Sequence, residues 1–151
     1  MNVAEAKVID GLKPEDFKCF FENWAPASVE INDTVKRVDK CDEEEGHDVY
    51  KMEINFPWPL WNRLMILTLY KRLDQPDGSQ ICFFSCDGND AMKEKHFDEN
   101  DKKNFVLGTQ PIGGWILTPI KNEAGEVTGT NMMFANSANV QGNVPATIVN
   151  S

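Results

Sequence analysis

One segment limits the possible folds more than any other. Residues 63–70, Arg-Leu-Met-Ile-Leu-Thr-Leu-Tyr, have the leucine, β-branched and aromatic content of a β-strand. Because successive side chains of a strand point to opposite faces, one face carries Arg63, Met65, Leu67 and Leu69, and the other carries Leu64, Ile66, Thr68 and Tyr70. In an open sheet with one face in water, a strand has only one apolar face. Because both faces of this strand are apolar, each must be covered by a helix, a partner or a ligand.

The rest of the chain predicts more strands and little helix. Hydrophobic runs bounded by turn residues predict strands over residues 3–9, 28–38, 48–55, 63–72, 79–86, 105–120 and 127–140. A helix is expected from Pro14 to Asn23, with proline and acids in its first turn. Residues 87–104 are polar without a period, which predicts a long surface loop. The predicted fold class is α+β, with antiparallel neighbouring strands.

The predicted helix has an aromatic face. Phe17, Phe20, Phe21 and Trp24 recur at intervals of three and four residues, so their side chains share one side of the helix. We expect this side to lie on the sheet.

Size and charge exclude several classes of protein. With 151 residues, of which 41% are hydrophobic, the chain can form one ordinary core, and we expect one domain over residues 1–151. The net charge of −9 argues against nucleic acid and anionic bilayers as partners. The N-terminal residues lack the features of a signal peptide, and no apolar run approaches the length of a membrane span, so we expect a cytoplasmic protein.

No pattern of reactive side chains indicates catalysis, a metal or a cofactor. Four cysteines are too few and too irregular for a disulfide scaffold, and we expect reduced thiols. On a strand, Cys82 and Cys86 would share a face about 13 Å apart, too far for a bridge. His47 and His96 are not spaced as zinc ligands with a cysteine, nor as a base beside a nucleophile. We expect a protein that is not an enzyme, without metal or cofactor.

Two stretches together suggest a family. Residues 56–72, FPWPLWNRLMILTLYKR, place a proline-containing approach and an Asn-Arg pair before a long strand. Residues 113–151 place Gly114 and Trp115 on a strand that ends at Pro119, followed by a paired strand and then Asn139, Gly142 and Pro145. Both stretches resemble START (StAR-related lipid transfer) domains of the helix-grip superfamily. The resemblance implies a curved antiparallel sheet around a helix, with a lipid held between them.

The sequence departs from the family pattern at several points. Leu64 and Asn139 stand where the family has acids, and Leu69 and Tyr50 stand where some steroid carriers have a paired arginine and acid. A sterol is therefore not the expected ligand. Compared with the family, the chain also lacks a first helix and two strands before Val3 and the closing helix after Ser151, so we expect a domain incomplete at both ends.

The residues expected to contact the ligand are Arg63, Met65, Leu67, Leu69, Tyr50 and Trp115. Arg63 is singled out because a guanidinium among apolar neighbours needs an anion or water. It could form an ion pair with Asp48, Glu53 or a chain terminus, or bind the polar head group of a lipid. Trp58 and Trp61 could plug the core or form the rim of an opening.

Three functions remain open on the sequence. The first is the binding, and with it the transfer or sensing, of a lipid or other apolar molecule in a cavity between sheet and helix. The second is a protein-interaction module whose open apolar face binds a helix from a partner, and the third is a helix-grip cyclase or hydrolase. Transient membrane contact and a homodimer that covers an open apolar face are further expectations.

Overall fold

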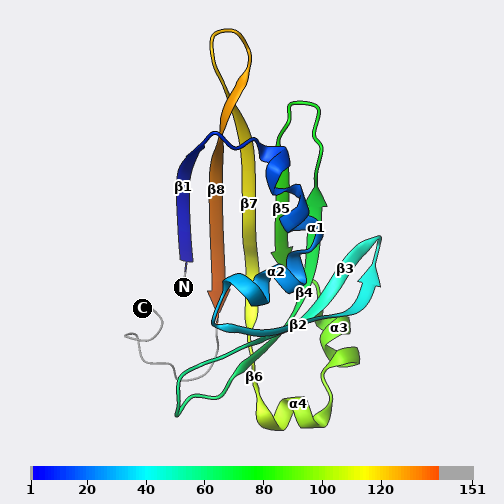
Figure 1. Ribbon diagram of the computed structural model, residues 1–151. Coiled ribbons are helices and arrows are strands. Elements are labelled where there is room, and N and C mark those ends of the chain that lie inside the picture. The colour runs from blue at the N-terminus through cyan, green and yellow to red at the C-terminus, as the bar shows by residue number, and fades with distance from the viewer. Residues whose placement is uncertain (1, 140–151) are drawn as a thin grey trace.

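The computed structural model describes residues 2–139, which form one curved antiparallel sheet with short helices packed against it (Figure 1). The sheet order is β1-β8-β7-β5-β4-β3-β2, and β6 pairs in parallel with β4. The strands are β1 (Asn2–Asp10), β2 (Val35–Glu44), β3 (His47–Ile54), β4 (Arg63–Arg72), β5 (Gln80–Ser85), β6 (Val106–Leu107), β7 (Thr109–Lys121) and β8 (Val127–Asn139). The predicted α+β class is confirmed.

The helices lie between strands at two places in the chain. A 3-10 turn (Pro14–Phe17), α1 (Lys18–Glu22) and α2 (Trp24–Ile31) connect β1 to β2, and α3 (Asp90–His96) and α4 (Glu99–Asn104) connect β5 to β6. The predicted helix over Pro14–Asn23 is confirmed as the first turn and α1. The expected end of the last strand at Val140, and the segment around Gly142 and Pro145, lie outside the described residues.

The strand predicted over residues 28–38 is wrong in its first half. Residues 28–31 belong to α2, and β2 begins at Val35. Trp24 and Ser28, four residues apart, are both buried, and the Ser28 hydroxyl donates to the Trp24 carbonyl at 2.6 Å. Val29 and Ile31 suggested a strand by their alternation, but both are exposed, at 38% and 65%. The buried side chains here have the four-residue spacing of a helix, whereas the apolar side chains that suggested a strand are exposed.

The surface loop predicted over residues 87–104 is also wrong, because α3 and α4 form there. Asp98 caps α4 by accepting a hydrogen bond from the Asp101 amide at 2.7 Å. A few apolar side chains fix the two helices to the sheet: Phe97 is buried, and Met92 and Phe105 pack against the same cluster. The segment therefore covers the sheet although most of its residues are polar.

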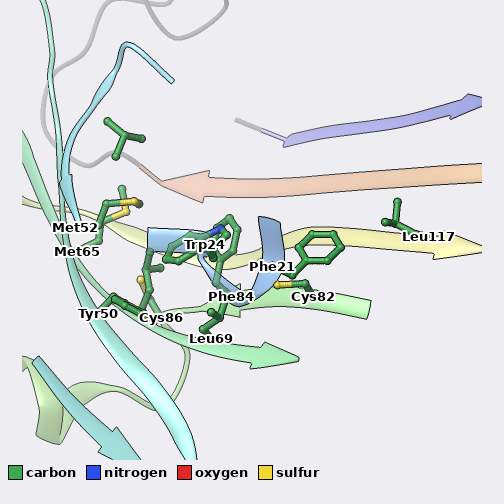
Figure 2. Close-up of a cluster of buried hydrophobic side chains, with 12 residues drawn as sticks. Phe21, Trp24, Tyr50, Met52, Met65, Leu69, Cys82, Phe84, Cys86 and Leu117 are labelled. Atoms are coloured by element: carbon green, nitrogen blue, oxygen red, sulfur yellow. The ribbon is translucent and has the colours of Figure 1, made fainter. Parts of the chain in front are cut away.

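Both faces of β4 are covered, as the sequence predicts. The inner cluster, on the side of α1 and α2, consists of Phe21, Trp24, Val35, Tyr50, Met52, Met65, Leu67, Leu69, Cys82, Phe84, Cys86 and Leu117 (Figure 2). The outer cluster, on the side of α3 and α4, consists of Val49, Leu64, Ile66 and Phe97. Helices on each side thus bury the alternate residues of one strand.

Polar contacts fix α3 and α4 to the outer face. The buried Asn89 side chain accepts from the Thr68 hydroxyl at 3.0 Å and donates to the Ile66 carbonyl at 3.3 Å. Lys51 pairs with the buried Asp101 and donates to the His96 carbonyl at 3.1 Å. Buried polar groups satisfied in this way define one arrangement of helix and sheet.

Candidate ligand-binding face

The structure brings the predicted site residues to the inner face of the sheet. Tyr50, Met65, Leu67 and Leu69 belong to the inner cluster, and Trp115 is half-buried against it. The register explains this meeting, because Tyr50 of β3 lies opposite Leu67 of β4. Arg63 begins the row that Met65, Leu67 and Leu69 continue along β4.

A continuous series of ring contacts crosses this face, and we call it the aromatic row: Phe134, Trp115, Phe84, Trp24 and Tyr50. Neighbouring ring centroids lie 5.3, 5.9, 5.2 and 5.4 Å apart in that order. Phe134 and Trp115 are half-buried, whereas Trp24 and Tyr50 are buried. The row therefore leads from a partly open end on β8 and β7 to a closed end on β3.

Side chains of α1 pack on the middle of the row. Phe20 and Phe21 contact the Trp115 ring at centroid distances of 5.8 and 5.9 Å. In Figure 2, Phe21 of α1 and Trp24 of α2 lie among side chains that come from the strands. The predicted aromatic face of the helix is confirmed by these contacts.

Two glycines of β7 make space for the row. A Cβ at Gly113 would lie 2.6 Å from the Phe84 ring, and one at Gly114 would lie 2.3 Å from the Cys82 carbonyl oxygen. Gly114 also has a φ of +156°, which L side chains rarely adopt. The Gly-Gly pair before Trp115 therefore lets β5 and its phenylalanine approach β7 closely.

Two buried polar atoms of the inner face have no hydrogen-bond partner within residues 2–139. They are the indole nitrogen of Trp24 and the side-chain oxygen of Gln80. Gln80 lies opposite Leu117 and is 1% exposed. An unsatisfied buried polar group costs about 1–3 kcal/mol. A ligand with a matching acceptor or donor would remove that cost.

Arg63 is 2% exposed and lies at the start of the inner row. Its guanidinium lies over the Phe56 ring, 4.3 Å from the centroid, and Nη1 donates to the Trp61 carbonyl. Burial lowers the pKa of Arg63 from its ordinary value. A guanidinium forms charge-assisted hydrogen bonds with carboxylate and phosphate oxygens, which are stronger than those between neutral groups.

The two acids considered as partners of Arg63 contact other cations. Asp48 lies 2.8 Å from the Lys40 ammonium, and Glu53 lies 3.1 Å from the Lys36 ammonium. Trp58 and Trp61, which could plug the core or form a rim, are both exposed, at 92% and 57%. Neither plugs the core.

Several inner-face residues were not among the predicted site residues: Trp24, Met52, Cys82, Phe84, Leu117 and Phe134. Alternation on the strands was the signal that could have found most of them, since Cys82, Phe84 and Cys86 follow one another at intervals of two. Burial raises the pKa of the Cys82 thiol to about 12 and that of Cys86 to about 11. All four cysteines are free, as predicted.

Within residues 2–139, no group of three or more His, Cys, Asp or Glu side chains is placed to hold a metal ion. No helix in that range is long and apolar enough to cross a membrane.

Sequence comparison finds no relatives: no family model matches the chain, and no curated protein does. Solved structures do match. Human STARD10 superposes with a TM-score of 0.72 at 13% identity over 99% of this chain, and the lipid transfer and protein localization domain of human StarD13 with 0.67 at 9% identity over 95%. A STAR-related lipid transfer protein from Xanthomonas axonopodis gives 0.64 at 14% identity over 95% of this chain and 72% of its own.

The chain spans 55% of the STARD10 chain and 65% of the StarD13 chain. At these identities the similarity concerns the fold. The resemblance noted in the sequence is confirmed at that level: the chain has the helix-grip fold of START domains.

Proposed function

We propose that this protein binds a lipid or another apolar molecule on the inner face of its sheet, as a carrier or a sensor. The observation that carries the proposal is the aromatic row, which leads from half-buried Phe134 and Trp115 to the closed end at Tyr50. Burying an apolar chain along such a row is favourable by about 0.8 kcal/mol per methylene group. The lipid transfer proteins that share the fold support this reading.

The helices that cover the inner face are suited to yield to a ligand. α1 has five residues and α2 has eight, and helices this short are not stable alone in water. They are kept in place mainly by ring packing, such as Phe20 on Trp115. A ligand that replaces these ring contacts exchanges one apolar contact for another.

The predicted site residues take distinct roles in this proposal. Met65, Leu67, Leu69 and Tyr50 line the path of the apolar chain, and Trp115 lies at its entrance. The polar end of the ligand lies toward Arg63, the buried cation that begins the row on β4. The proposal is one of binding and not of catalysis: the thiols of the inner face have raised pKa values and are poor nucleophiles at neutral pH.

Neighbouring residues of β8 give a matched test. Phe134 faces the aromatic row, whereas Met133 is 52% exposed on the opposite face. Phe134→Ala is expected to weaken the binding of a fluorescent fatty acid about ten-fold or more, because a buried ring is worth about 1.5–3 kcal/mol. Met133→Ala should leave the dissociation constant unchanged. Equal affinities of the two variants would contradict the proposed face.

A further inference from the structure

The two edges of the sheet differ in how they are protected against pairing. β2, at one edge, has register shifts between Val35 and Arg37 and between Lys40 and Asp42, and most of its residues are charged. Bulges and charges of this kind prevent a strand from pairing with another chain. The edge at β2 is therefore closed to further strands.

β1, at the other edge, has no bulge, and only three of its nine residues are charged. Its nine residues pair with β8 in unbroken register, without bulge or proline. Among residues 2–139, β8 is its one neighbouring strand. Seven of the nine residues are exposed, and the charges away from the ends are Glu5 and Lys7. Neither has an ion-pair partner in the described chain.

The backbone amides and carbonyls of successive β1 residues point alternately to β8 and to the free edge. The Gly11 amide, directly after β1, donates to the Thr128 carbonyl of the neighbouring segment at 2.9 Å. In an antiparallel pair alternate residues point their backbone groups to the partner, so odd-numbered residues bond to β8. The amides and carbonyls of Ala4, Ala6 and Val8 therefore point to the free edge.

We propose that β1 pairs antiparallel with β1 of a second copy of this chain, centred on Ala6. In this register Ala6 lies opposite Ala6 and Ala4 opposite Val8, so the outward-pointing residues form the hydrogen-bonded pairs. Glu5 then lies opposite Lys7 of the second copy, and Lys7 opposite its Glu5. These are non-hydrogen-bonded pairs, in which the side chains come closer, so the register forms two cross-strand ion pairs.

The charges also exclude the adjacent registers. A shift of the second strand by two residues keeps the same backbone groups in position to bond. In one direction it places Glu5 opposite Glu5, and in the other it places Lys7 opposite Lys7. Like charges directly opposite each other destabilise a strand pair. The sequence of β1 is thus complementary to itself in one register.

The outer faces of the two sheets would continue into one another. Ile116, Met133 and Ala6 occupy one row across β7, β8 and β1. All three are exposed, Ile116 at 42% and Met133 at 52%. Pairing at Ala6 joins this row to the same row of the second copy across a two-fold axis, as isologous dimers require.

Charge reversal tests the pairing by sedimentation equilibrium of the full chain, from about 1 to 500 μM, a range suited to a small interface. Wild type is expected to dimerise, and Lys7→Glu or Glu5→Lys to weaken the dimer about ten-fold or more. The double variant Glu5→Lys/Lys7→Glu restores both pairs and should dimerise like wild type. An equimolar mixture of the single variants should form heterodimers.

Disulfide trapping tests the register. Across a hydrogen-bonded pair the Cα atoms lie about 5.5 Å apart, within reach of a disulfide. Ala6→Cys, in a Cys19→Ser background, should therefore cross-link on mild oxidation. Ala4→Cys is the control, since two such residues would lie about 13 Å apart.

A monomeric wild type over the whole concentration range would overturn the proposal, as would a double variant no more dimeric than the single ones. Equal cross-linking at positions 4 and 6 would overturn the register. None of these outcomes bears on ligand binding by the aromatic row, which is measured separately with Phe134→Ala.

Discussion

Buried polar side chains at the inner face distinguish this protein from one with a wholly apolar core. Arg63 is the largest of the most deeply buried side chains and stands at the start of an apolar row. The Trp24 indole nitrogen and the Gln80 side-chain oxygen are also buried, and they have no hydrogen-bond partner within residues 2–139. Buried polar atoms without partners, such as those of Trp24 and Gln80, are costly to keep in a solid core.

Replacing Arg63 is predicted to weaken the binding of the ligand's polar end and not that of its apolar chain. Arg63→Met keeps much of the apolar stem and removes the charge, so affinity for a phospholipid should fall about ten-fold or more, while affinity for a fatty alcohol of equal chain length stays the same. Calorimetric titration with both ligands measures the difference, and circular dichroism checks the fold. An equal loss for both ligands would remove Arg63 from the polar end of the site.

The inner-face thiols predict a pH dependence of stability. Because burial raises the pKa of Cys82 to about 12 and that of Cys86 to about 11, the unfolded chain ionises these thiols at lower pH than the folded one. Their contribution is present below pH 9 and is lost as the pH rises from about 9 towards 12. The double variant Cys82→Ala/Cys86→Ala should show a shallower fall in urea-unfolding free energy over this range. The same slope in both proteins would contradict the assigned burial.

At the scale of elements, the strands were predictable and the helices were less so. The leucine, β-branched and aromatic content of residues 63–72 predicts β4, and because side chains of any strand alternate between its faces, the residues of each face follow from the sequence. α2 was missed because its exposed Val29 and Ile31 imitate that alternation. The cap at Asp98 is a local signal for α4, but the burial of Phe97 against the sheet, which fixes both helices, depends on contacts with β3 and β4 that no local pattern reveals. The inner-face residues of β5 follow from the same alternation once it is known which of its two faces is the inner one.

The attachment of α3 and α4 to the sheet predicts a large effect from one side chain. Phe97 is 4% exposed in the outer cluster, so Phe97→Ala should lower the free energy of unfolding by about 3–5 kcal/mol. Lys103→Ala, at an exposed position of the neighbouring α4, should change it by no more than about 0.5 kcal/mol. Urea denaturation compares the two. A small loss for Phe97→Ala would mean that α3 and α4 contribute little to the folded state.

In the whole molecule, one sheet is used in three ways. Its outer face at β3 and β4 is closed by α3 and α4, its inner face carries the aromatic row under α1 and α2, and its β1 edge has the charges to pair with a second copy. The first use follows from the two apolar faces of β4.

Native mass spectrometry of the freshly purified protein, with analysis of its organic extract, tests the central claim most directly. We predict a stoichiometric adduct of a lipid or other apolar molecule on wild type and on Met133→Ala, and a much smaller fraction on Phe134→Ala. A ligand-free protein that takes up no lipid when vesicles or fatty acids are supplied would contradict the account. So would an adduct retained equally by all three proteins, because the ligand would then lie away from the aromatic row.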